Sequence, residues 1–173
     1  LFATDPVNVW FNQTTPPTNA TDVLLMGPVT SGTNTLSTSS TPPLVPGTVY
    51  YIGIENPNTT NVSVAFQVEF NVTALSNGVP VTSTLGTNAY PRYFSYDVTT
   101  NATALVFAAT NLTGNVSLVA NYGGPLPNLI DFDYGSFNPG PTDESIVVLT
   151  NSTPVPLQPG RWFIGVLPAG PLP

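Results

Sequence analysis

Apolar and polar residues alternate without a break from Asn61 to Val72. Every even-numbered position in this stretch is Val or Phe, and every odd-numbered position is Asn, Ser, Ala, Gln or Glu. Because successive side chains of a β-strand point to opposite faces, the pattern predicts a strand with one apolar and one polar face. Seven further strands are predicted on similar grounds, at residues 7–12, 48–55, 93–98, 102–109, 116–121, 145–150 and 161–167.

Turn-forming residues separate these predicted strands. The chain has 20 Pro and 14 Gly among its 173 residues, and no long window keeps an apolar stripe of helical period. We therefore expect an all-β fold with little or no helix. Many short strands with this spacing are typical of antiparallel β-sandwiches of the jelly-roll or Ig-like kind.

The chain also repeats itself at an interval of about 110 residues. Residues 43–47 read Pro-Leu-Val-Pro-Gly and lead to Tyr-Tyr-Ile-Gly-Ile at 50–54, while residues 156–160 read Pro-Leu-Gln-Pro-Gly and lead to Trp-Phe-Ile-Gly-Val at 162–166. Upstream, residues 8–11 are echoed by residues 115–118. Two tandem β-sandwich domains explain the repeat, and we predict them at residues 1–74 and 92–173 with a linker at 75–91.

Each predicted domain lacks a strand that the other has. The first has no counterpart of the strand at 93–98, and the second has no counterpart of the strand at 61–72. An open edge exposes unpaired N–H and C=O groups, and a strand donated by a neighbouring subunit would fill it. The candidate donor is the extended opening segment, Leu1, Phe2, Ala3 and Thr4. Two alternatives stay open: the domains are smaller, or the chain is a piece of a longer repetitive polypeptide.

Four motifs of the second domain follow one another in a recognisable order. They are Tyr-Phe-Ser-Tyr-Asp-Val at 93–98, Thr-Gly-Asn-Val-Ser-Leu-Val-Ala-Asn-Tyr-Gly at 113–123, Asp-Glu-Ser-Ile at 143–146 and Gln-Pro-Gly-Arg-Trp-Phe-Ile-Gly-Val at 158–166. Their order resembles that of the prepeptidase C-terminal family of bacterial and archaeal domains. The resemblance implies a jelly-roll-like sandwich with an accessory role on a secreted or cell-surface protein. Asn115 and Ser117 stand where that family has paired Asp, so a calcium role of those acids does not carry over.

The composition excludes several classes of function. Charged residues make up 6% of the chain, the net charge is −7, and Arg92 and Arg161 are its two basic residues. Nucleic acids and anionic membranes are therefore excluded as partners, because little positive charge is present to meet phosphates. The absence of Cys and His removes disulfides, thiolate chemistry and His-based catalytic triads. No apolar run reaches the length of a membrane span, and we expect no enzyme activity.

Acceptor triplets for N-glycosylation, Asn-x-Ser/Thr, are unusually frequent. Nine occur where random placement gives roughly three or four, and none has Pro in the middle. They begin at Asn12, Asn19, Asn58, Asn61, Asn71, Asn101, Asn111, Asn115 and Asn151. Asn61 and Asn71 both fall on the polar face of the predicted strand, where a glycan would not disturb a core. The triplets indicate a heavily glycosylated extracellular chain, and their accidental formation in a Thr- and Asn-rich sequence is the alternative.

Two further groups of residues are candidates for ligand binding. Asp131, Asp133, Asp143 and Glu144 form the one acidic cluster, which is a candidate for Ca²⁺ or a solvated acidic loop. Five aromatic residues are candidates for a sugar-binding platform or for core packing: Trp10, Tyr50, Tyr51, Trp162 and Phe163. Apart from N-linked glycans and this calcium candidate, no cofactor is expected.

Together these patterns predict an extracellular structural protein. We expect a heavily N-glycosylated subunit of a filament or surface layer, in which copies of the chain assemble head to tail by β-strand donation. The style of such a chain is similar to that of glycosylated archaeal surface threads and pili. The alternative is an accessory carbohydrate- or cell-wall-binding module of a secreted protein, with a polysaccharide as its partner.

Overall fold

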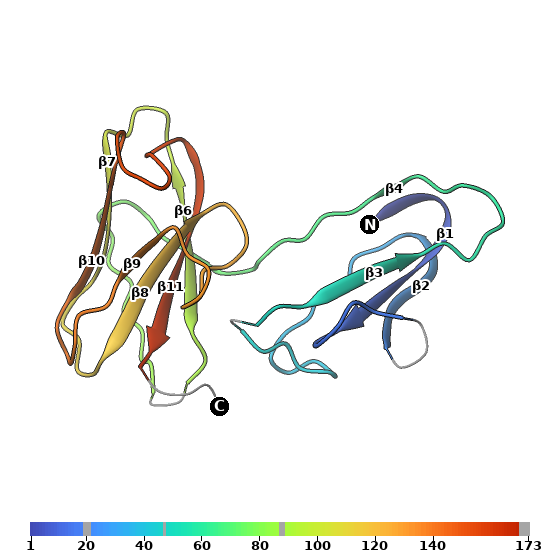
Figure 1. Cartoon of the computed structure of the whole chain (residues 1–173), viewed down its shortest axis with the longest axis horizontal. Coiled ribbons are helices and arrows are strands. Elements are labelled where there is room, and N and C mark those ends of the chain that lie inside the picture. Colours follow the sequence, from blue (N-terminus) through green and yellow to red (C-terminus); the bar gives the residue numbers. More distant parts are fainter. Residues whose placement is uncertain (19–21, 47, 87–88, 170–173) are drawn as a thin grey trace. The chain divides into compact units, whose positions relative to one another are not determined.

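The computed structural model describes residues 1–18, 22–46, 48–86 and 89–169, and within them it contains β-strands and no helix (Figure 1). The prediction of an all-β fold is therefore confirmed. The chain divides into two compact units, Leu1–Phe70 and Asn71–Pro173. Each unit is described separately below.

The first unit is a sheet centred on β1 (Phe2–Asn12). Strand β2 (Val23–Ser31) pairs antiparallel with one edge of β1. The other edge is shared by β3 (Tyr51–Glu55), which lies beside residues 8–12, and β4 (Val64–Ala65), which lies beside Phe2 and Ala3. Gly27 lets β2 approach β1 closely, because a Cβ at this position would collide with the side chain of Asn8.

One face of β1 forms the core of the first unit. Its buried apolar residues are Ala3, Val7, Val9 and Phe11. The ring of Phe11 stacks on Tyr50 at a centroid distance of 5.3 Å, and the Tyr50 hydroxyl donates to the carbonyl oxygen of Val45. These two contacts hold the segment before β3 against the sheet. Burial of the two aromatic rings stabilises this arrangement.

The second unit contains two sheets. The larger has the strand order β5 (Thr73–Ala74), β6 (Arg92–Val98), β11 (Gly160–Pro168), β8 (Val116–Tyr122) and β9 (Tyr134–Ser136). The smaller pairs β10 (Glu144–Leu149) with β7 (Ala104–Ala109). Adjacent strands are antiparallel except β5 and β6, which are parallel.

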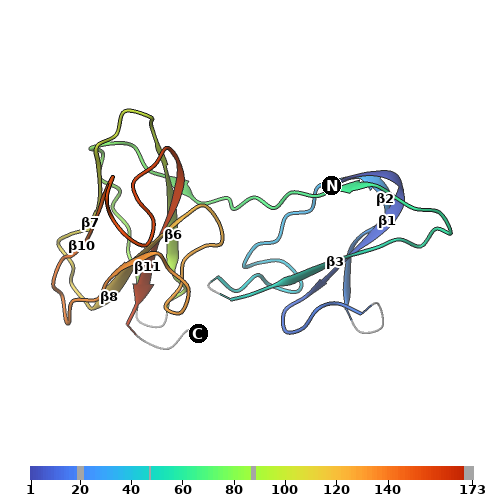
Figure 2. The same cartoon turned by 45° about the horizontal axis from the view of Figure 1, so that its top comes forward.

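The two sheets of the second unit pack face to face around one apolar core (Figures 1 and 2). Leu105, Phe107, Ile146 and Val148 point inward from the smaller sheet. Trp162 of β11 is fully buried opposite them and contacts Phe107, Tyr122 and Tyr134. Alternation of buried and exposed residues along β7 and β10 follows the period of two expected of strands with one covered face. The second unit is thus β-sandwich-like.

The structure differs from the sequence-based prediction in several strands and in the linker: β1 begins at Phe2 where the prediction began at residue 7, and β3 begins at Tyr51 where it began at residue 48. The predicted strand at 61–72 contributes Val64–Ala65 to β4, and residues 66–72 lie outside the strands. Strands β2, β5 and β9 were not predicted, because Gly27-Pro28 interrupts the alternation in β2 and because β5 and β9 have two and three residues. The predicted linker at 75–91 also begins inside the second unit, since Leu75 packs on its core and its N–H donates to the Ser95 carbonyl.

The repeated segments form the same strand pair in both units. β1 pairs antiparallel with β3, and β8 pairs antiparallel with β11. Gly53 lies opposite Trp10, whereas Gly165 lies opposite Val119 and not opposite Ser117, the echo of Trp10. The register of the pair β8–β11 is therefore shifted by two residues relative to that of β1–β3. Because side chains alternate with a period of two, a shift of two leaves every side chain on the same face of the sheet. The units share this pair but differ in strand number and layering, so two copies of one domain are not established.

Candidate assembly edges and glycan acceptors

A strand-like stretch of the first unit lies largely outside its sheet. This alternating segment, defined here as residues 62–69, enters the sheet at β4 and continues as an extended trace (Figures 1 and 2). No described strand pairs with residues 66–69. Phe66 and Val68, on its apolar side, are 40% and 55% exposed. An exposed alternating stretch of this kind is a template for pairing with another strand edge.

Strand β3 has one partner where its echo in the second unit has two. β11 lies between β6 and β8, and Ile164 in it is 2% exposed. β3 pairs with β1 along one edge, and among the described strands none pairs with the other. Ile52, the echo of Ile164, and Ile54 are each 39% exposed on the face that carries the buried Val9 and Phe11. The outer edge of β3 is therefore open and apolar.

The predicted donor segment, Leu1, Phe2, Ala3 and Thr4, is engaged within its own chain. The amino group of Leu1 donates to the Gly32 carbonyl at 3.0 Å, and the Gly32 N–H donates to the Leu1 carbonyl. Phe2 pairs with Ser31 of β2 and Ala65 of β4, and Ala3 is buried. In the single chain this segment completes β1.

The glycan acceptors fall into two structural groups, with Asn19 outside the described residues. Six acceptor side chains are exposed, and within the described ranges their amide groups make no hydrogen bond: Asn61, Asn71, Asn101, Asn111, Asn115 and Asn151. Asn101 and Asn151 lie in the turns after β6 and β10, and Asn111 and Asn115 lie between β7 and β8. These six amides are accessible to a glycosylating enzyme.

Asn12 and Asn58 form the second group, because their side chains hold the fold of the first unit. The Asn58 amide donates to the Pro6 carbonyl at 2.8 Å and to Asn56 Oδ1 at 2.9 Å. The Asn12 amide donates to Asp22, while its Oδ1 accepts from the backbone N–H groups of Thr14 and Thr15. A sugar on the Asn58 nitrogen would displace one of its two donated bonds, and a sugar on the Asn12 nitrogen would crowd its bond to Asp22.

The acidic residues do not gather into one site. The Asp133 carboxylate accepts from the Tyr122 N–H, and Asp143 accepts from the Asn111 N–H. Glu144 is fully buried, where it accepts from the Ser136 hydroxyl and from the Asn138 N–H at 2.7 Å. Among the described residues no three acidic side chains are arranged to hold a metal ion. Asp133, Asp143 and Glu144 each bond to backbone N–H groups of nearby turns and strands.

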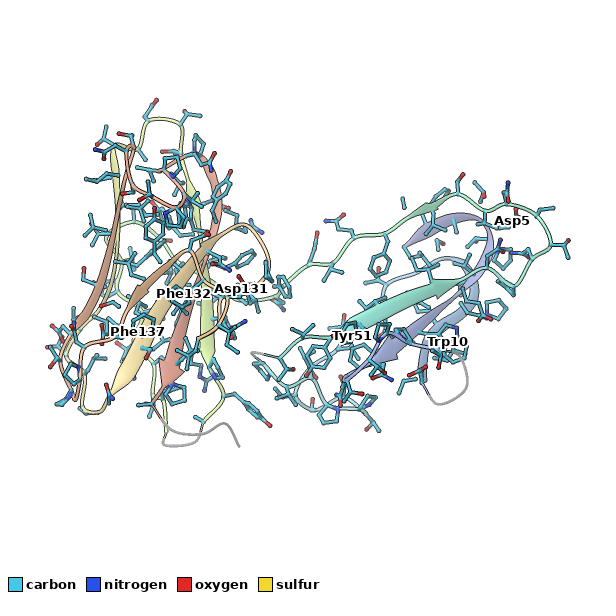
Figure 3. All side chains as sticks on the ribbon, in the orientation of Figure 1. Asp5, Trp10, Tyr51, Asp131, Phe132 and Phe137 are labelled. Atoms are coloured by element: carbon cyan, nitrogen blue, oxygen red, sulfur yellow. The ribbon has the colours of Figure 1, made fainter. Side chains whose placement is uncertain are left out.

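The candidate aromatic residues have separate roles. Trp162 and Phe163 are buried in the second unit, and Tyr50 packs on Phe11. Trp10 and Tyr51 are half-buried on the opposite face of the first sheet (Figure 3). The Trp10 Nε1–H donates to Glu55 Oε2 at 2.7 Å, beside a shallow hollow of about 250 Å³ lined by Trp10, Pro17, Thr18, Gly53, Ile54 and Glu55.

Two ionisable side chains of the second unit have shifted pKa values. Hydrogen bonds from Arg161 hold the pKa of Asp97 below its ordinary value, and the two side chains form an exposed ion pair at 2.9 Å. Burial raises the pKa of Tyr93 from 10.0 to about 12. Its hydroxyl is buried and has no hydrogen-bond partner among the described residues. Neither shift belongs to a group of side chains poised for proton transfer.

Comparisons with known proteins identify no relative of this chain. No protein-family model, curated protein or solved structure matches this chain. The resemblance to the prepeptidase C-terminal family therefore depends on the four motifs, which lie mainly on β6, β8, β10 and β11 of the second unit. In the described ranges, no helix is long and apolar enough to cross a membrane.

Proposed function

We propose that this chain is an extracellular structural subunit that assembles with copies of itself, by β-strand exchange, into an N-glycosylated filament or surface layer. The observation that carries the proposal is the coexistence of an open apolar edge on β3 and an exposed alternating segment at residues 62–69. Proteins normally protect strand edges with charges, prolines or covering loops. Residues 62–69 hold one charged residue, Glu69, and no Pro.

Strand exchange supplies enough free energy for a durable fibre. A donated strand of about eight residues that buries roughly 600 Å² of apolar surface contributes on the order of 15 kcal/mol before the cost of association is subtracted. Backbone hydrogen bonds add the directionality that fixes the register of the joint. The mechanism is therefore mechanical: neighbouring subunits are held by a continuous sheet.

In this proposal the glycans keep the assembled subunits hydrated. A chain in which 6% of the residues are charged has little ionic hydration at its surface, and net charge is a usual source of solubility. Sugars on the six accessible amides would hydrate the turns of the second unit and both ends of the alternating segment. They would leave the apolar side of that segment uncovered, since Asn61 and Asn71 flank it at positions in phase with its polar side.

The experiment is direct observation of assembly. The full chain, expressed in a host that N-glycosylates secreted proteins, is measured by sedimentation velocity and imaged by negative-stain electron microscopy. We expect particles much larger than the monomer and regular threads or layers. A glycosylated chain that remains monomeric at every concentration would exclude the structural role.

An accessory carbohydrate-binding module is the second candidate. The hollow lined in part by Trp10 and Glu55 favours it, because an aromatic face next to hydrogen-bonding groups is a common arrangement for sugar binding. Binding to a panel of insoluble polysaccharides tests this role. Trp10→Ala should abolish retention of a monomeric chain on its polysaccharide, whereas Phe137→Ala, on the second unit, should not.

A further inference from the structure

The internal repeat shows what the open edge of β3 lacks. In the second unit, β6 pairs with the edge of β11 that faces away from β8, and Ile164 between them is buried. In the first unit, the corresponding edge of β3 is open and Ile52 is 39% exposed. A strand laid against this edge would pair with β3 as β6 pairs with β11, and its apolar side would lie next to Ile52 and Ile54, as Phe94 lies next to Ile164.

The alternating segment of the same chain cannot fill this edge in the fold observed. The turn after β3 is fixed to β1 by the bond from the Asn58 amide to the Pro6 carbonyl. The Thr4 N–H then donates to the Ser63 carbonyl, and the Ser63 N–H donates to the Thr4 hydroxyl, both at 3.1 Å. These bonds direct Val64–Ala65 to β1, on the edge that β3 itself uses.

A second copy of the chain is the partner that fits. The alternating segment has the required form, with Val64, Phe66 and Val68 on one side and no Pro or Gly. Because the donor segment and the acceptor edge are different parts of one chain, each copy can donate to one neighbour and accept from another. Such a heterologous contact propagates as an open filament unless it closes into a ring.

We propose that residues 64–69 of one copy pair, as a β-strand, with the outer edge of β3 in a second copy. This inference rests on the proposed assembly and names its joint. It replaces Leu1–Thr4 as the donor segment, since those residues complete β1 within the chain.

Cysteine cross-linking tests the joint, because the natural chain has no Cys and any disulfide reports a designed contact. One chain carries Ile54→Cys and the other carries Phe66→Cys or Val68→Cys, so that two registers are sampled. A disulfide requires Cβ atoms about 3.5–4.5 Å apart, a separation found between neighbours on paired strands. The glycosylated chains are mixed, assembled, oxidised mildly and separated on a non-reducing gel.

Two variants serve as controls. Val106→Cys places an exposed thiol on β7, whose outer edge also has no strand partner among the described residues. Gln67→Cys places the donor thiol on the polar side of the segment. We expect at least tenfold more mixed dimer from Ile54→Cys with Phe66→Cys or Val68→Cys than from either control pairing.

The outcomes separate this inference from the proposed function. The proposed joint is overturned if the chain assembles but cross-links through Val106→Cys, through two copies of Val68→Cys, or through none of the pairs tested. Strand exchange would then take place at another edge. If the unsubstituted chain does not assemble, the proposed function fails and the joint fails with it.

Discussion

At the scale of single residues, Tyr93 is the group whose environment most affects the response to pH. In the unfolded chain the pKa of this tyrosine is 10.0, whereas in the folded chain burial raises its pKa to about 12. Keeping Tyr93 protonated therefore contributes to the free energy of unfolding. This contribution is fully present below pH 10 and is lost as pH rises from 10 to 12. Tyr93→Phe should flatten this part of the stability profile, measured by urea unfolding at each pH.

The same substitution has a second expected effect at neutral pH. Removing a buried hydroxyl without a partner should raise the free energy of unfolding by about 1 kcal/mol. Tyr134→Phe is the contrasting change and should lower the free energy of unfolding, because the Tyr134 hydroxyl donates to the Val155 carbonyl at 2.6 Å. A loss of stability in Tyr93→Phe would mean that its hydroxyl is satisfied in solution.

Asn58 and Asn61 carry the same acceptor motif but differ in what their amides do. Asn58→Ala removes the bond to the Pro6 carbonyl and should lower the free energy of unfolding by about 1 kcal/mol. Asn61→Ala removes an exposed amide without a bond in the described structure and should change it by less than about 0.5 kcal/mol. Chemical denaturation of unglycosylated protein measures both. Equal effects would contradict a structural role of Asn58.

At the scale of elements, Glu144 joins the two sheets of the second unit at one side. Its carboxylate accepts from Ser136 of β9 and from the Asn138 N–H, while β10 begins at Glu144 itself. Glu144→Ala removes two hydrogen bonds to a buried carboxylate and should lower the free energy of unfolding by about 2 kcal/mol, measured by thermal or chemical unfolding. Asp131→Ala, at an exposed carboxylate in the same region, is the control and should have little effect. Similar losses in both variants would contradict this role.

The two sides of the alternating segment should differ in their effect on assembly. Val68→Asp places a carboxylate on the apolar side, where burial in a joint without a partner is costly. Gln67→Asp adds the same charge at the adjacent position on the polar side. We expect sedimentation to show monomers for Val68→Asp and assemblies for Gln67→Asp. Assembly of both variants would mean that this segment does not form the joint.

At the scale of the whole molecule, glycosylation should raise the measured mass clearly above that of the bare chain. The bare chain has a mass of 18.2 kDa. Intact-mass spectrometry of the natural product should give a clearly larger value that falls towards 18.2 kDa after deglycosylation. Peptide mapping should find sugar on the six accessible amides and little on Asn12 and Asn58, whose amides are bonded in the fold. A bare mass, or full occupancy of Asn58, would contradict this expectation.

The sequence alone determined the local conformation of most strands. Alternation and turn residues located β6, β7, β8, β10 and β11 to within two residues, because a strand with one covered face must repeat with a period of two. The repeat also predicted that the first domain lacks a counterpart of the strand at 93–98, and the edge of β3 that corresponds to the β6-paired edge of β11 has no partner among the described strands. The nine acceptor triplets are likewise a property of sequence.

Tertiary structure decided which strands find partners. The clearest alternation in the chain, at residues 61–72, gave only Val64–Ala65 to a sheet, because pairing requires an available edge and alternation describes one chain segment alone. The donor role of Leu1–Thr4 was inferred from the extended, apolar character of this segment, but in the fold β2 and β4 pair with it on both edges. The acids near Asp131 looked clustered in sequence, but folding directs the carboxylates of Asp133, Asp143 and Glu144 to separate backbone N–H groups. Contacts between distant segments set these outcomes, and local patterns cannot encode them.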